Sequence, residues 1–91
     1  MIVMSVDSNE IIGGCIAILE RILADDSVPR NIRRVAEDIK MILLNKDETA
    51  SVRGAVAISK LDTISNDPNM PLHIRTMVWN LASQLERIPV D

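Results

Sequence analysis

The chain matches itself when it is shifted by 42 residues without a gap. Between the pairs Ile12/Gly54 and Lys46/Ile88, eight of the 35 aligned positions are identical. The matches are apolar residues at helical spacing, a loop aspartate, a proline and an arginine: Ile16, Leu19, Ile22, Asp25, Pro29, Ile32, Arg33 and Leu43, against Ile58, Leu61, Ile64, Asp67, Pro71, Ile74, Arg75 and Leu85. What repeats is therefore fold-forming, and no cluster of reactive side chains repeats with it. The match predicts one helical domain, 1–91, with internal repeats at about 12–46 and 54–88.

Apolar residues recur at helical spacing in four segments, which turn residues separate. We expect helices at about 8–24, 29–44, 48–64 and 71–88, listed here in chain order. Asp7 is a suitable N-cap, and Pro29 and Pro71 suit a first helical position, where a missing N–H costs nothing. Gly13 and Gly14 weaken the first helix, so either another helix approaches them closely or the first turns fray. No segment alternates with period two, and no strand is expected.

The third segment is apolar on two opposite sides. Residues of the first side are Val52, Ala55 and Val56, and residues of the second are Gly54, Ala57, Ile58, Leu61 and Ile64. A helix with this pattern is usually central or buried.

Short loops make consecutive helices antiparallel neighbours. Each αα-hairpin exposes an apolar face that it cannot bury alone, so the two hairpins must pack on each other. The expected fold is all-α, a four-helix up-and-down bundle built from two duplicated αα-hairpins. The pairs Ile32-Arg33, Val52-Arg53 and Ile74-Arg75 also resemble HEAT-type repeats, but such solenoids generally need three or more units.

Three stretches, 27–34, 51–53 and 64–71, together resemble a small family of uncharacterised archaeal proteins. Their sequences are SVPRNIRR, SVR and ISNDPNMP. The resemblance covers nearly the whole chain. It implies an all-helical, bundle-like domain of about this length, and it implies no activity and no catalytic or ligand residues.

Composition narrows the classes of function. The net charge is −3, and Trp79 is the only aromatic residue, which disfavours base stacking and electrostatic attraction to nucleic acid. A single cysteine, no basic segment near Met1, and no apolar run longer than 11–19 predict a cytoplasmic protein outside the membrane. The apolar fraction of 47% is high for a small domain. It indicates either self-association or simply a rich aliphatic core.

Reactive side chains are few and scattered. Cys15 lies in the apolar stripe of the first helix, where a structural thiol is expected. The lone His73 lacks a second histidine or a carboxylate at i+4, so we expect a surface or capping role rather than metal binding. Carboxylate pairs such as Asp25-Asp26 lack metal-site spacing. We therefore predict no enzyme, no catalytic residues, no metal and no cofactor.

Arg30, Arg33 and Arg34 place three cations at the N-terminus of the second helix, against the helix dipole. One interpretation is local pairing, since Arg33 and Arg34 have Glu37 and Asp38 at i+4. The other is an anion patch for phosphate or an acidic partner. The patch supports an alternative function, binding of nucleic acid or association with the ribosome, which the acidic composition disfavours.

Trp79 points about 140° away from the apolar stripe of the fourth helix, and Leu72 shares its direction. Trp79 either marks a binding surface or packs under Arg75 or the segment Met1–Met4. The candidate interface comprises Trp79, Leu72, Arg75, Leu61 and Ile58. The leading hypothesis is a non-catalytic helical interaction or scaffold module, a homo-oligomer or the partner of another protein. The two repeats differ at this surface, where Arg30, Arg34 and Glu37 correspond to Leu72, Thr76 and Trp79.

Overall fold

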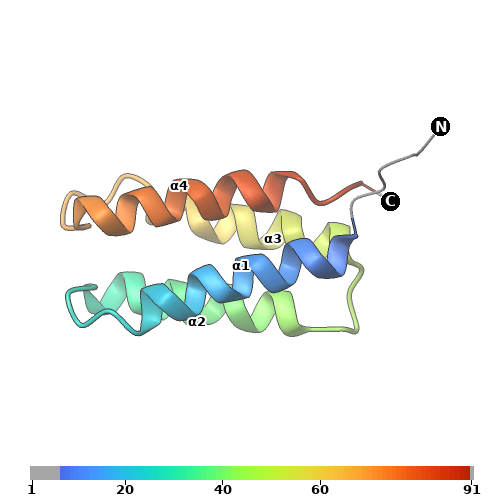
Figure 1. The fold of residues 1–91 in the computed structure, drawn as a ribbon, viewed down its shortest axis with the longest axis horizontal. Coiled ribbons are helices and arrows are strands. Elements are labelled where there is room, and N and C mark those ends of the chain that lie inside the picture. Colours follow the sequence, from blue (N-terminus) through green and yellow to red (C-terminus); the bar gives the residue numbers. More distant parts are fainter. Residues whose placement is uncertain (1–6, 91) are drawn as a thin grey trace.

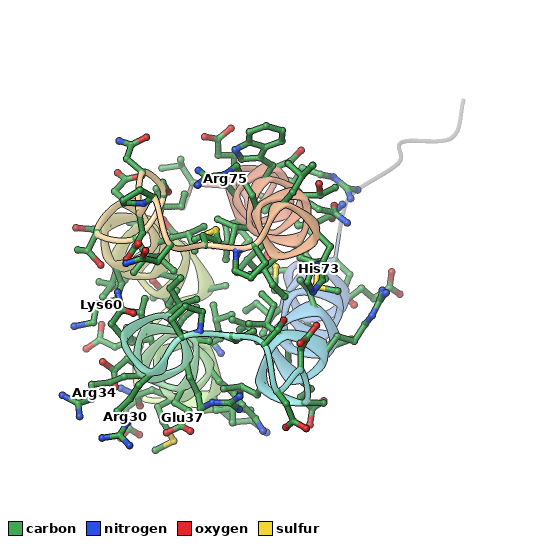
Figure 2. All side chains as sticks on the ribbon, turned by 90° about the vertical axis from the view of Figure 1, so that its left-hand side faces the viewer. Arg30, Arg34, Glu37, Lys60, His73 and Arg75 are labelled. Atoms are coloured by element: carbon green, nitrogen blue, oxygen red, sulfur yellow. The ribbon has the colours of Figure 1, made fainter. Side chains whose placement is uncertain are left out.

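The computed structural model describes residues 7–90, which form four α-helices joined by short loops (Figure 1). The helices are α1 (Ser8–Leu23), α2 (Arg30–Leu44), α3 (Ala50–Asp62) and α4 (Leu72–Glu86). Each helix runs antiparallel to the next, and α4 packs back against α1 (Figure 2). The predicted all-α, four-helix up-and-down bundle is confirmed, and the described range contains no strand. Closure of α4 on α1 separates this fold from an open solenoid.

One apolar core fills the space between the four helices. Every helix contributes aliphatic side chains to it, and no charged or polar residue of the described range is buried with them. Burial of each such side chain stabilises the fold by roughly 1.5–3 kcal/mol. The largest fully buried members are Leu19, Ile22, Ile32, Ile39, Leu43, Ile74, Leu81 and Leu85.

The eight identical pairs of the 42-residue match occupy equivalent environments. Five are apolar pairs that pack in or against the core. Pro29 and Pro71 both precede the first residue of a helix, with φ of −58° in each case. The remaining two pairs, the aspartates and the arginines, build the loops.

The three loops between helices share one hydrogen-bond pattern. A carboxylate or amide oxygen at the loop start accepts the backbone N–H two residues later, an arrangement that fixes a tight turn. The three bonds are Ser27 N to Asp25 Oδ1 (2.8 Å), Asp47 N to Asn45 Oδ1 (3.1 Å) and Asn69 N to Asp67 Oδ1 (2.8 Å). The carbonyl of the same residue then accepts the N–H three residues later in each loop.

An arginine in the first turn of the following helix completes each loop by reaching back ten residues. Arg33 donates to the carbonyls of Leu23 and Asp25, Arg53 to that of Leu43 (2.7 Å), and Arg75 to those of Ser65 (2.9 Å) and Asp67 (2.8 Å). The last carbonyls of a helix have no partner within the helix, and a guanidinium supplies strong, charge-assisted donors to them. The middle loop shares this geometry although its 20-residue offset lies outside the 42-residue match. Common turn chemistry is therefore sufficient to explain it, and duplication of an ancestral hairpin stays a prediction.

Two local predictions need correction. Pro29 and Pro71 are N-cap residues rather than first helical residues, because their extended ψ angles of 153° and 148° place them just outside the helix. The second apolar side of α3 is not buried: Val52 and Val56 are 43% and 45% exposed. In a closed four-helix bundle each helix turns one side to the core, so no helix is surrounded.

Glycine substitutions test the packing. Helix α1 continues through Gly13 and Gly14, and no described atom lies within 4 Å of a Cβ added at either position. The close-approach explanation for these glycines is therefore wrong. We expect Gly13→Ala and Gly14→Ala each to raise the free energy of unfolding by about 0.5–1 kcal/mol, measured by urea denaturation.

Gly54→Ala is the matched control. A Cβ at Gly54 would lie 3.1 Å from Ile88 Cδ1, so this variant should be destabilised although it too replaces a helical glycine. Equal stabilisation of all three variants would contradict the packing described here.

Candidate functional site

The flank of α4 that faces α3 carries large apolar side chains in contact with solvent. Trp79 is 61% exposed and Leu72 is 75% exposed. Arg75, Trp79, Ala82 and Glu86 form one stripe at helical spacing along this flank. Its orientation follows from its two ends, because Arg75 bonds to the α3–α4 loop and Glu86 lines a groove shared with α3. Trp79 therefore lies between these points, on the α3 side of α4.

The groove lies between the first half of α3 and the end of α4. Its volume is about 250 Å³, and its walls are mainly apolar or small side chains: Ser51, Gly54, Ala55, Ile58, Leu85, Glu86, Ile88 and Val90. Gly54 shapes the floor, because its missing side chain leaves room for Ile88. Sequence reasoning had placed Gly54 on an apolar helix side but gave no indication of the groove, since Ile88 and Val90 follow the end of α4.

The predicted interface residues fall into three groups. Trp79 and Leu72 are exposed, as a binding surface requires, and Ile58 is half-buried and lines the groove. Leu61 is only 2% exposed and belongs to the core, so it is unavailable to a partner. Arg75 is half-buried, and its guanidinium is engaged with loop carbonyls. The alternative contact of Trp79 with Met1–Met4 lies outside the described residues.

The arginine cluster at the start of α2 divides in the same way. Arg33 is a loop residue, while Arg30 and Arg34 are exposed and project outward from α2 together with Glu37 (Figure 2). The predicted i, i+4 pairs do not form, because Asp38 pairs with Lys60 of α3 at 3.6 Å and Arg33 turns to the backbone. Within residues 7–90, neither Arg30 nor Arg34 forms an ion pair.

His73 forms a link between the two hairpins rather than a cap. His73 Nε2 donates to Asp25 Oδ2 (2.7 Å), and Ser27 Oγ donates to Asp25 Oδ1 (2.6 Å). The three residue types are those of a hydrolytic triad, but the connections differ. In a triad the aspartate holds one histidine nitrogen while the other faces the serine. Here Nε2 faces both partners, and the serine proton is directed to the aspartate.

A second link, at the equivalent positions, runs in the opposite direction. Asn31 Nδ2 donates to Asp67 Oδ2 (2.6 Å). Asn31 and His73 are 42 residues apart, as are Asp25 and Asp67. Each hairpin thus donates to the loop of the other, and we call these two bonds the reciprocal brace. The 42-residue match contained the signal for it, namely two matched loop aspartates and two polar residues at another matched position.

The braced aspartates are acidic. Hydrogen bonds from the side chain and backbone of Ser27, followed by that from His73, lower the pKa of Asp25 from 3.8 to about 2. The N–H of Asn69 and the amide of Asn31 lower the pKa of Asp67. Cys15, by contrast, is fully buried, and burial raises its pKa to about 11, so its thiol is not activated.

Acid denaturation tests the brace. Because the pKa of Asp25 is lowered by folding, its ionised form stabilises the fold above about pH 4, and this contribution is lost as the pH falls from about 4 to about 2. We expect Asp25→Asn to be less stable than the original protein at pH 7. The difference should shrink over that acidic range in guanidinium titrations followed by circular dichroism.

Asp26→Asn is the control, because no hydrogen bond of the Asp26 side chain is found in the described range. Its stability should follow that of the original protein at every pH. A stability gap for Asp25→Asn that stays constant down to pH 2 would show that the brace does not depend on the charge of Asp25.

None of the helices within residues 7–90 is long and apolar enough to cross a membrane. Comparison with known proteins adds relatives of the same size. A UPF0147 protein of Methanosarcina mazei is 58% identical over 85 residues, covering 93% of this chain and 91% of its own length. One from Archaeoglobus fulgidus is 59% identical over 73 residues, covering 80% and 83% respectively.

Two crystal structures share the fold. The protein of unknown function MMP1188 superimposes with a TM-score of 0.89 at 41% identity, covering 97% of this chain and all of that one. A UPF0147 protein from Thermoplasma acidophilum gives 0.83 at 34% identity, covering 90% and 96%. The pattern of the uncharacterised protein family UPF0147 matches residues 1–88. The chain therefore belongs to the UPF0147 family, whose members occur across the archaea and have no established activity.

Proposed function

We propose that the protein is a non-catalytic helical interaction module that self-associates through the α3–α4 face. The observation that carries this proposal is the exposure of Trp79, 61% of whose surface contacts solvent. The proposal also places the module in the cytoplasm, in keeping with a single buried thiol.

Trp79 has no task in the fold of its own chain. The core is formed by aliphatic residues of all four helices and is complete without the indole. An indole buries about 150–250 Å² when it is covered, so its exposure leaves substantial apolar surface in water. Tryptophan is also the residue type most enriched at binding hot spots. A role between molecules accounts for its position better than a role within one.

The surroundings of Trp79 support an interface of useful size. Leu72 lies about two turns before it on α4, and the apolar groove begins about two turns after it. Isolated exposed apolar residues are common, whereas a continuous apolar face marks a binding surface. A chemical role draws less support, since the one cluster of reactive residue types, Asp25, Ser27 and His73, is engaged in the brace.

Removing the indole tests self-association. We expect Trp79→Ala to keep its helical circular dichroism, because the residue is exposed, and to associate at least about tenfold more weakly in sedimentation equilibrium. Met41→Ala is the matched control, since Met41 is 69% exposed but lies on α2. A Trp79→Ala protein with the same association constant as the Met41→Ala protein would remove the basis of the proposal.

The second candidate is anion binding by Arg30 and Arg34, which the lack of carboxylate partners in the described residues favours. Two free guanidinium groups can contact phosphates of a nucleic acid, and such contacts weaken steeply with salt. We expect any RNA binding to fall in the double variant Arg30→Ala/Arg34→Ala, measured by fluorescence anisotropy at low and moderate salt. Binding of RNA that is absent at low salt, or unchanged in the double variant, would eliminate this candidate.

A further inference from the structure

We infer that the self-associated form is a two-fold dimer in which Trp79 of each copy inserts into the α3–α4 groove of the other. The inference rests on the proposed function and specifies its partner, which is a second copy of this chain, and its contact. An interface of this kind is isologous, because the same groove and the same indole occur on both subunits.

The groove fits an indole in size and chemistry. An engineered apolar cavity of about 150 Å³ is large enough for benzene, so about 250 Å³ is large enough for the bicyclic indole. Its lining is chiefly aliphatic, and the hydroxyl of Ser51 and the carboxylate of Glu86 are the polar groups at its edge. These oxygens can accept from the indole N–H, which usually finds a partner when it is buried.

Trp79 does not fill the groove of its own chain. It is not among the residues that line the groove, and it remains mostly exposed. Along α4, Trp79 and Glu86 are seven residues apart, which corresponds to about 10 Å. The indole and the groove are therefore neighbouring features of one face, separated by two helical turns.

A two-fold axis that exchanges them must pass midway along this distance, between Ala82 and Ser83. Both side chains are small, with Ala82 half-buried and Ser83 exposed, so two α4 helices can approach there in antiparallel orientation. Small residues at a crossing point permit close contact between helices. The two Glu86 carboxylates lie on opposite sides of the axis, so the arrangement does not bring them together.

The face is adequate for a stable dimer. A standard interface covers about 800 Å² of each partner, which is about one seventh of the 5871 Å² accessible surface of the chain. Two inserted indoles form the apolar centre, and Leu72, Ile58 and Val90 surround it. This arrangement has the buried aromatic anchors that carry most of the energy in protein interfaces.

Ala55→Phe tests the insertion by filling the groove while leaving Trp79 in place. Ala55 is exposed at the groove wall, so the added ring occupies the groove without entering the core. We expect association at least about tenfold weaker than in the original protein, with unchanged helical circular dichroism. Should Ala55→Phe fail to fold, Ser51→Leu fills the groove from its other end.

Mixing the variants distinguishes insertion from other contacts. Trp79→Ala has a groove but no indole, and Ala55→Phe has an indole but no groove. A mixture can form one of the two contacts, so differently tagged variants should associate more tightly with each other than either does with itself. A mixture no tighter than the separate variants would overturn the inference.

Fluorescence gives an independent readout, because Trp79 is the only tryptophan. Its emission should shift to shorter wavelength as the original protein associates, and should stay at the solvent-exposed wavelength in Ala55→Phe. If Trp79→Ala is monomeric but Ala55→Phe associates normally, the insertion is wrong and the proposed function stands. If the original protein is monomeric at millimolar concentration, the proposed function itself fails.

Discussion

The carbonyl groups at the ends of the helices are the constraint on which the bundle depends. A helix that stops leaves its last carbonyls without partners, and a short loop offers few donors of its own. In each loop, an arginine from the next helix supplies those donors, while an aspartate or asparagine closes the turn. The loop geometry then sets how consecutive helices meet, and their apolar sides come together as a core. The interhelical packing thus follows from polar chemistry at the bundle ends.

Most of the fold could be predicted because its causes are local in the sequence. Apolar periodicity gave the four helices, and Asp7 was correctly read as the N-cap of α1, where its side chain accepts the N–H of Asn9. The errors arose where a side chain has a choice of partners. Asp38 could pair with Arg34 one turn away or with Lys60 on the adjacent helix, and only the assembled bundle decides between them. Leu61 shows the same limit, because helical spacing alone did not tell a core position from a surface one.

The candidate site could be predicted only in part, for a related reason. The direction of Trp79 follows from counting along one helix, and its exposure agrees with that count. The groove depends on Gly54 and Ile88, which are 34 residues apart and meet only through packing of α3 against the end of α4. Likewise, the brace between Asp25 and His73 joins positions that no local pattern connects. Features assembled from distant segments need the three-dimensional structure.

The placement of the reciprocal brace gives the molecule a mechanical character. The α2–α3 loop joins the two hairpins covalently at one end of the bundle, while the brace joins the α1–α2 and α3–α4 loops at the other (Figure 1). The first connection acts as a hinge and the second as a latch. Both bonds of the latch end on carboxylates, so acid releases it while the hinge stays closed. The hairpins can then swing apart as two intact units, which makes this bundle a device that opens at one chosen end.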